Sequence, residues 1–422
     1  MHILIATPYL PWPLNAGGKV AQFSTLKCLS KDHTFTIICP VHSKNEAEGI
    51  QEIENRISNV RVKAIPFYKD RIPSNYSRLR DFLRNGLNSI RPLQDSNNSP
   101  NIEALAQYPY YPFSPLSSTF IQTLTEELES GVDLFQVEFA EMLSLAALKI
   151  PNIPKIFINH QIHWMYAQRH IKVHGFNPYS KYLTNRIFAE ESIYLSGFDS
   201  IVVFSDEDAQ EMSTVVDPNK IDVSPFPVPA DIDILNPIPA RHLPIKNFTF
   251  VGSEAHDPNR DAIEWLLSDI WPLILDSIPE AQLFVVGNWS ENWCYNHQSK
   301  DIIYTGFVEN ITEVMQNTIQ LVPVRIGSGI RTKILTAMAL KVPVVSTTIG
   351  IEGIKVCDFE HALIRDTAND FALGAIALAT DSKLANHIAD GALEFVRNNY
   401  GAEVVRKNRN ALYEKVMLKY NL

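Results

Sequence analysis

The segment around residues 318–345 most constrains how this chain can fold. An apolar run at Thr318–Val322 predicts a short buried strand, and residues 327–329 read Gly-Ser-Gly directly beyond it. Residues 341–345 indicate a second buried strand. Between the loop and this strand, apolar residues recur at the spacing of one helix face. A strand, a glycine loop, a helix and a strand form one βαβ unit, so we expect a parallel α/β sheet with the loop at the carboxyl end of a strand. The apolar helix positions are Ile330, Ile334, Leu335, Met338 and Ala339.

This glycine loop favours a phosphate or diphosphate ligand. Glycines allow close backbone approach, and a helix start offers unpaired N–H groups and a positive dipole end to an anion. Arg331 and Lys333 add two cationic side chains beside that helix start. The alternative is that the glycines serve only the turn and that both basic side chains are solvated. The loop by itself leaves both interpretations open.

Residues 323–353 resemble the donor-binding segment of family 4 glycosyltransferases of the GT-B fold. The closest subgroup carries P-x-R-x-G-x-G-x-R-x-K-x-L-E-A-M-A and is linked with bacterial cell-surface polysaccharide assembly. The resemblance implies an α/β protein of GT-B architecture, with two Rossmann-like parallel-sheet domains facing each other across a cleft. The matching residues are Pro323, Arg325, Gly327, Gly329, Arg331, Lys333, Leu335, Ala337, Met338 and Ala339.

The activity implied by the resemblance is a retaining, metal-independent hexosyl transfer. The donor would be a nucleotide-diphosphate sugar, and the acceptor a hydroxyl of a glycan or a lipid-linked glycan. No cofactor is expected besides this donor substrate. In chemical terms, the leaving diphosphate needs charge stabilisation, which Arg331, Lys333 and the helix-start N–H groups can supply.

The resemblance also implies site residues. His160, Arg331 and Lys333 would be catalytic. His160 follows a predicted strand at residues 153–158, where the family places a histidine in the cleft; otherwise such a histidine is commonly a polar cap on the sheet. The implied donor-binding residues are Gly17, Gly18, Gly306, Gly327, Ser328, Gly329, Ile330, Thr336 and Glu352.

Two departures from the family weaken the expected donor site. Ser328 and Thr336 stand where the wider family has two glutamates, and the second glutamate usually grips the ribose hydroxyls. Ser253 and Asn259 stand where many relatives have an arginine and a lysine. We therefore expect weak donor binding unless another acceptor such as Glu352 contributes. The alternative is a non-catalytic GT-B protein that acts as a binding or assembly partner in polysaccharide synthesis; an epimerase of nucleotide sugars is a further alternative.

The chain is long enough for two domains. Its 422 residues exceed one ordinary domain. We expect an acceptor-side domain at residues 1–228, a proline-rich linker at 229–245 and a nucleotide-sugar domain at 246–400. The resemblance implies that a final helix at 401–422 crosses back to the first domain.

The net charge and hydropathy of the chain limit the binding partners and the cellular location that we expect. A net charge of −10 argues against nucleic-acid binding. No apolar run approaches the length of a membrane span, and residues 1–10 predict a strand rather than a signal peptide, so we expect a cytoplasmic protein. Basic and apolar residues alternate in a predicted helix at 71–91. This helix is either an interfacial segment at the inner face of the membrane or a half-exposed helix of the domain. The loop at 95–115 is expected to face the acceptor.

Overall fold

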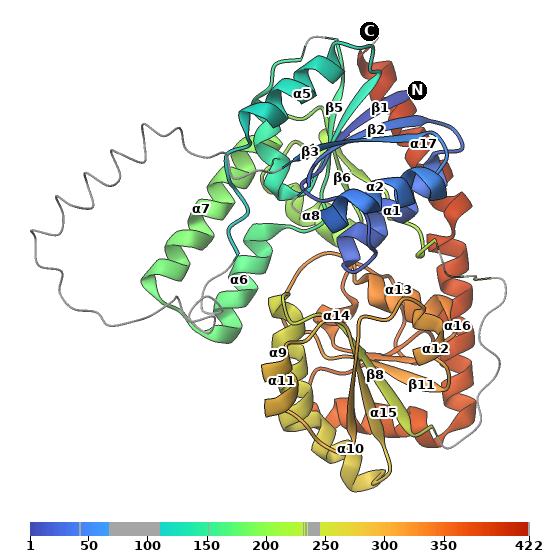
Figure 1. Ribbon diagram of the computed structural model, residues 1–422. Helices are drawn as coiled ribbons and strands as arrows, with labels where there is room; N and C mark the ends of the chain where they lie inside the picture. Colours follow the sequence, from blue (N-terminus) through green and yellow to red (C-terminus); the bar gives the residue numbers. More distant parts are fainter. Residues whose placement is uncertain are drawn as a thin grey trace, which may run out of the picture.

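Two parallel β-sheets, one above the other in Figure 1, organise the molecule. The computed structural model describes residues 1–41, 44–66, 110–150, 152–230, 232, 234 and 245–420. The predicted helix at 71–91, most of the loop at 95–115 and most of the linker lie outside these residues. The predicted fold class, two Rossmann-like parallel-sheet domains, is confirmed.

The first sheet has the order β3-β2-β1-β4-β5-β6-β7, and all neighbouring strands are parallel. Its central strands are buried on both faces, which is why they read as continuous apolar runs. The strands are β1 (His2–Ala6), β2 (Thr34–Val41), β3 (Val60–Pro66), β4 (Leu134–Glu138), β5 (Lys155–Ile158), β6 (Ser200–Val203) and β7 (Ile221–Val223). The helical segments are α1 (Gly17–Leu29), α2 (Lys44–Arg56), α5 (Ser118–Leu128), η1 (Ala140–Ala147), α6 (His163–His174), α7 (Pro178–Leu195), α8 (Asp206–Met212) and η2 (Pro218–Lys220).

The second sheet has the order β10-β9-β8-β11-β12-β13 and is also parallel. Its strands are β8 (Asn247–Val251), β9 (Gln282–Val286), β10 (Ile302–Gly306), β11 (Thr318–Val322), β12 (Val344–Ser346) and β13 (Leu363–Ile364). The helical segments are α9 (Asp257–Trp265), η3 (Leu266–Ile270), α10 (Trp271–Ser277), α11 (Glu291–Asn296), α12 (Ile311–Val314), α13 (Thr332–Ala339), α14 (Thr348–Ile351), α15 (Ala368–Thr380), α16 (Ser382–Tyr400) and α17 (Ala402–Tyr420). None of the helices in the described part of the chain is long and apolar enough to cross a membrane.

The last two helices run along both domains. Figure 1 shows α16 beside the second sheet and α17 continuing, in red, to the first. α16 packs against α13, and α17 packs against α1. The chain passes between the domains twice, after Val228 and after Tyr400. The two passages meet where the Val228 N–H donates to the Tyr400 carbonyl at 2.9 Å. The domain limits expected at 228, 245 and 400 stay predictions.

Local sequence chemistry explains the differences from the expected elements. The strand expected at 341–345 begins only at Val344, because Lys341 turns the chain with a φ of 60°. Pro272 has no N–H to donate back to the preceding turn, and the helix is interrupted there by the π-helical segment η3. Helix α6, which the sequence analysis did not predict, makes hydrogen bonds and an ion pair from the first domain to the second.

We predict that buried Arg409 anchors α17. The residue is 1% exposed, and its guanidinium donates to the Ser224 hydroxyl and carbonyl at 3.0 and 3.1 Å. Arg409→Met leaves those acceptors unpaired, which should lower the free energy of unfolding by about 1–3 kcal/mol. Arg406→Met, on the same helix, removes an ion pair with Asp32 near solvent and should change it little. Urea denaturation of both variants measures this, and equal losses would contradict it.

Candidate functional site

A cleft of about 1430 Å³ lies between the two domains at the carboxyl ends of both sheets. Its lining joins the start of α1, the end of β5, the loops after β8 and β10, and the start of α13. Open α/β sheets bind ligands at this edge, because loops and helix N-termini converge there. The fold therefore brings the glycine loop of the second domain opposite the first domain.

The glycine loop is shaped by two residues in the left-handed region. Gly327 has a φ of 123° and Gly329 a φ of 77°. Arg331 caps the loop, since its Nη1 donates to the Ser328 carbonyl at 2.8 Å and also to the Gly329 carbonyl. Burial lowers the pKa of Arg331 to about 10. Arg331 thus braces the loop as well as adding positive charge, which the sequence pattern did not indicate.

Lys333 presents a cationic side chain to the cleft. Its Nζ donates to Asn259 Oδ1 at 2.8 Å and lies 5.1 Å from the centre of the Phe250 ring. Asn259 is itself held by a hydrogen bond from Nδ2 to the Ser253 carbonyl at 3.1 Å. Burial, and then the nearby charge of Arg331, lower the pKa of Lys333 to about 7. A half-buried ammonium without a carboxylate partner among the described residues is well placed to attract an anion.

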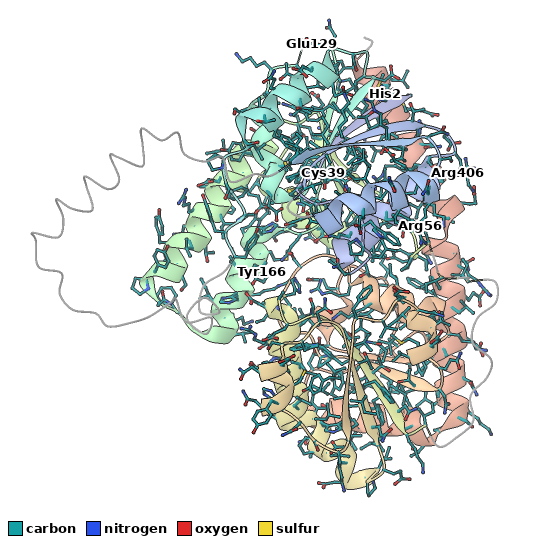
Figure 2. The ribbon with its side chains drawn as sticks, in the orientation of Figure 1. His2, Cys39, Arg56, Glu129, Tyr166 and Arg406 are labelled. Carbon is teal, nitrogen blue, oxygen red and sulfur yellow. The ribbon has the colours of Figure 1, made fainter. Side chains whose placement is uncertain are left out.

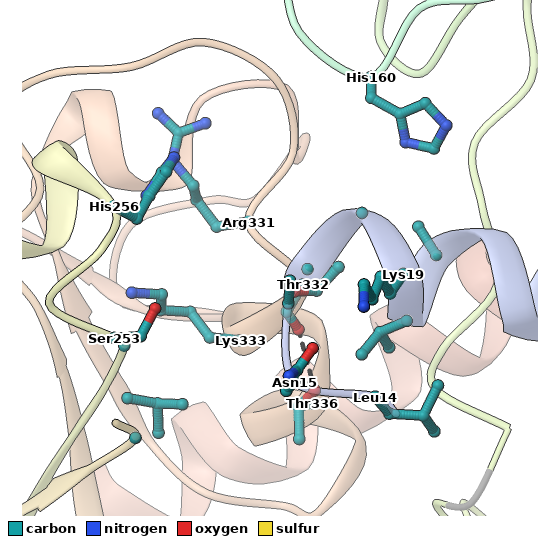
Figure 3. A pocket seen from close by; sticks show the side chains of 18 of the residues that line it. Leu14, Asn15, Lys19, His160, Ser253, His256, Arg331, Thr332, Lys333 and Thr336 are labelled. Atoms are coloured by element: carbon teal, nitrogen blue, oxygen red, sulfur yellow. Dashed lines mark hydrogen bonds between the residues drawn. The ribbon is translucent and has the colours of Figure 1, made fainter. Parts of the chain in front are cut away.

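His256 adds a third nitrogenous side chain to this face. Figure 3 shows His256 close to Arg331, with Lys333 beside Ser253 on the same side of the cleft. Desolvation, followed by the charges of Lys333 and Arg331, lowers the pKa of His256 to about 4, so its ring is neutral at pH 7. A neutral imidazole can donate a hydrogen bond to a phosphate oxygen without adding repulsion between cations.

His160 faces these groups from the other domain. Its side chain is 9% exposed, and its ring stacks on Phe139 at 3.9 Å between ring centroids. Nε2 lies 2.9 Å from Glu138 Oε2, so the carboxylate favours the tautomer with its proton on Nε2. Nδ1 then keeps a lone pair, and it lies toward Gly18 at the start of α1.

A buried chain of hydrogen bonds extends behind His160. Gln136 donates to Glu138 Oε1 at 2.6 Å, and the Tyr413 hydroxyl donates to Gln136 Oε1 at 2.7 Å. Tyr413 belongs to α17, so the final helix fixes the carboxylate that orients His160. Burial raises the pKa of Tyr413 to about 12, which keeps its proton available for donation.

Helix α6 connects the first domain to the glycine loop. The Ser328 hydroxyl donates to the Ile162 carbonyl, just before α6, at 3.0 Å. Arg169 donates to the Gly327 carbonyl at 2.5 Å and pairs with Glu352 at 2.5 and 2.6 Å. Tyr166, at the boundary in Figure 2, donates to Asp257 at 3.1 Å. The two domains are therefore in direct contact in this structure.

The structure brings most of the predicted site residues together. His160, Arg331 and Lys333 line the cleft, as do six of the predicted donor-binding residues. Gly306 ends β10, and the residues after it line the cleft; Gly329 abuts the His160 carbonyl. Glu352 also lies outside the lining, and its carboxylate is engaged by Arg169. Their binding roles stay predictions. The six that line the cleft are Gly17, Gly18, Gly327, Ser328, Ile330 and Thr336.

Several important residues were missed by sequence reasoning. Glu138 ends the strand beside β5, and a carboxylate at a strand end next to a histidine is a signal that the sequence did contain. Asn259 was noted only as a departure, although it holds Lys333. Arg169 and His256 belong to no recognisable sequence motif.

In the described part of the chain, Cys357, Glu360 and His361 lie close enough to share a metal ion, outside the cleft lining.

The comparisons with known sequences agree with this arrangement. Residues 245–381 match the family model described as glycosyl transferases group 1, which supports sugar transfer. A protein of Klebsiella pneumoniae, described as an uncharacterized 44.6 kDa protein in the cps region, is 23% identical over 419 residues, covering 96% of this chain and 97% of that protein.

Solved structures with the same architecture are GT-B glycosyltransferases. TarM of S. aureus has a TM-score of 0.65 at 12% identity and covers 98% of both chains. Sucrose-phosphate synthase from Thermosynechococcus elongatus has a TM-score of 0.66 at 13% identity over 99% of both chains. HepE from Anabaena, solved with UDP and glucose, has a TM-score of 0.63 at 12% identity, covering 98% of this chain and all of the other. These similarities show the GT-B fold.

We predict that Gly329 permits the contact between the domains. A Cβ at this position would lie 2.7 Å from the His160 carbonyl oxygen, and φ is 77°. Gly329→Ala should therefore force the loop away from the first domain, open the molecule and weaken ligand binding in the cleft. Small-angle X-ray scattering should then show a larger radius of gyration.

The matched control is Gly131→Ala. Gly131 also has a positive φ, of 100°, but a Cβ at this position would meet no heavy atom within 4 Å other than those of its chain neighbours. This variant carries only backbone strain, about 1–2 kcal/mol, and should keep the wild-type radius of gyration. The interpretation fails if both variants scatter alike.

Proposed function

We propose that this protein is a glycosyltransferase that uses a nucleotide-diphosphate sugar and glycosylates a hydroxyl of a glycan or glycolipid. The observation that carries the proposal is the Lys333 face of the cleft. There a lysine without a carboxylate partner among the described residues, a neutral histidine and the start of α13 converge on one volume. These groups suit a diphosphate, whose charge increases as the sugar departs.

The proposed chemistry assigns separate tasks to the two domains. Lys333 and the first N–H groups of α13 would stabilise the leaving diphosphate, while Arg331 keeps their loop in shape. His160 would accept a hydrogen bond at Nδ1 from a hydroxyl of the transferred sugar, with Glu138 holding the ring. Because the charge stabilisation comes from protein groups, we propose a metal-independent transfer.

The finer assignment rests on resemblance and on relatives. The motif at residues 323–339 supports a family 4 enzyme that transfers a hexosyl group with retention. The crystal structure of HepE contains UDP and glucose, so UDP is the first nucleotide to test. The relative from a cps region supports a role in polysaccharide assembly. We propose a cytoplasmic enzyme at the inner face of the membrane, where a glycolipid acceptor would be held; the 71–91 helix as its lipid contact stays a prediction.

We predict that diphosphate binding protonates Lys333. A bound anion stabilises the ammonium and raises its pKa from about 7. UDP should therefore bind with uptake of close to one proton between pH 7.5 and 9, and its affinity should fall as pH rises. Calorimetry in buffers of different ionisation enthalpy measures the uptake. Lys333→Met removes one charged hydrogen bond to the diphosphate. It should therefore weaken UDP binding at pH 7.5 by about tenfold or more and abolish the proton uptake.

Lys383→Met is the matched control, since Lys383 is exposed on α16 and lies outside the cleft lining. It should retain both the affinity and the proton uptake. Wild-type protein that binds no UDP or other nucleoside diphosphate would disprove the donor assignment. Binding without release of sugar from any donor would instead favour the non-catalytic alternative.

We predict that Tyr413 acts on turnover through Gln136 and Glu138. Tyr413→Phe removes the donor that lies 2.7 Å from Gln136, which frees the amide to rotate and loosens the carboxylate behind His160. A donor identified by a thermal-shift screen of nucleotide sugars provides the assay. Tyr413→Phe and Glu138→Gln should lower kcat several-fold, His160→Ala should lower it furthest, and all three should keep their UDP affinity.

Asn410→Ala controls for the docking of α17. Asn410 lies on the same helix and bonds to Asp32 and His33, and it makes none of the hydrogen bonds that lead to His160, although the His33 ring packs edge-on against Tyr413 at 5.5 Å between ring centroids. The Asn410→Ala variant should lower the melting temperature without a matching loss of kcat. If kcat follows the melting temperature across all four variants, the hydrogen-bond chain has only a structural role.

A further inference from the structure

A second polar cluster occupies the first-domain side of the cleft. It consists of Tyr9, after β1, Glu141, in η1, and Tyr110, before α5, and all three line the cleft. Both hydroxyls donate to the same carboxylate oxygen, Glu141 Oε1, with Tyr110 at 3.2 Å. These three residues take part neither in the hydrogen-bond chain behind His160 nor in the contacts of Lys333, so they have no function in the donor chemistry proposed above.

The cluster is one aromatic ring away from His160. Tyr9 packs edge-on against Phe139 at 5.3 Å between ring centroids, and Phe139 stacks on His160 at 3.9 Å. A ligand held by Tyr9 and Glu141 would therefore be adjacent to the group that faces the transferred sugar. It would also be on the domain opposite the Lys333 face.

The cluster is chemically suited to an uncharged polyhydroxyl ring. Tyr9 is 37% exposed and Tyr110 50% exposed, so aromatic surface is open to pack against the C–H face of a sugar. Glu141 Oε2 has no hydrogen-bond partner among the described residues and can accept from ligand hydroxyls. Burial, followed by the charge of Glu141, raises the pKa of Tyr110 to about 12 and raises that of Tyr9 further, so both phenols remain neutral donors at pH 7.

The charge of Glu141 excludes one class of ligand. No lysine or arginine in the described part of the chain pairs with Glu141. The nearby His163 is hydrogen-bonded to the Gln161 carbonyl. Burial lowers the pKa of His163, but Glu191 and, to a smaller extent, Glu141 raise it overall. An anionic group placed at Oε2 would meet a carboxylate that no lysine or arginine of the described residues neutralises, in a partly desolvated cleft. The site therefore discriminates against uronic acids and phosphates at this position.

We propose that Tyr9, Tyr110 and Glu141 form the acceptor-sugar subsite and that the sugar bound there is uncharged. This inference rests on the proposed glycosyltransferase function and specifies its acceptor class. The tyrosine rings orient the sugar face, and Glu141 selects for hydroxyl donors over anions.

The test compares matched neutral and anionic probes on the full-length protein in the presence of UDP. Ligand-observed NMR gives dissociation constants for the methyl glycosides of glucose, galactose and mannose, and for the corresponding methyl uronides. Wild-type protein should bind at least one neutral glycoside about tenfold more tightly than its uronide, since a charged hydrogen bond is replaced by repulsion. Glu141→Gln should remove most of that ratio by weakening the neutral probe and admitting the uronide.

Two further variants separate the charge from the fold. Tyr9→Phe removes a hydroxyl but keeps the carboxylate, so it should weaken the neutral glycoside without lowering the ratio. Tyr182→Phe changes an exposed tyrosine of α7 outside the cleft lining and should leave both constants unchanged.

The outcomes distinguish this proposal from the donor assignment. If UDP binds as predicted but no neutral glycoside does, the acceptor subsite is wrong while the donor site stands. Equal or tighter binding of the uronide, or a ratio that Glu141→Gln leaves unchanged, also overturns the subsite. Absence of UDP binding together with intact glycoside selectivity would instead overturn the donor assignment alone.

Discussion

One guanidinium joins the two halves of this molecule at the place where the ligand would bind. Arg169, on α6 of the first domain, pairs with both carboxylate oxygens of Glu352 and donates to the Gly327 carbonyl in the second domain. Its side chain and that of Glu352 are 21% and 22% exposed, so the pair is only partly screened by water. A planar donor that binds a carboxylate at two points fixes orientation as well as distance. The geometry of the glycine loop therefore depends on the first domain being closed against it.

This arrangement leaves the Lys333 face positively charged. Nearby carboxylates are already engaged: Asp261 by Arg325, Asp257 by Tyr166 and Glu352 by Arg169. Among the described residues, Lys333 Nζ donates a hydrogen bond to the neutral Oδ1 of Asn259 and pairs with no carboxylate. An amide holds an ammonium in place without neutralising it, whereas a carboxylate would compete with the phosphates. The absence of a family lysine at 259 is thus compatible with a working anion site, because the asparagine presents Lys333 to the cleft.

The sequence was sufficient for the fold and for one wall of the site. Parallel strands buried on both faces leave continuous apolar runs, and a glycine loop between β11 and α13 leaves a motif, so both could be predicted. The hydrogen-bond chain from Tyr413 to His160 could not, since Tyr413 and Gln136 are 277 positions apart and neither type of residue is unusual where it stands. Helix α6 packs against α7 and buries Trp164 in the core of the first domain. It was missed because Tyr166 and Arg169, which contact the other domain, form no recognisable motif in the sequence. Arg331 was read as a free cation, but its carbonyl partners depend on a loop geometry that only the three-dimensional structure shows.

Thr336 stands where the family has a glutamate that grips the ribose, and the structure favours a different replacement carboxylate from the one that is nearest in sequence. Thr336 lines the cleft, but its hydroxyl donates back to the Thr332 carbonyl at 3.0 Å, which leaves an oxygen with reduced capacity for a ribose. Glu352 is near in sequence, yet it could accept from a ribose only after releasing Arg169, and that would cost the contact that closes the cleft. Of the carboxylates that line the second-domain side, Asp257 accepts from Tyr166, while Glu309 bonds to no described residue. Glu309 follows β10, three residues after Gly306, which the resemblance includes among the donor-binding residues. A carboxylate contact to the ribose, where one is made, is therefore physically easier from Glu309 than from Glu352, and it leaves the connection between the domains intact.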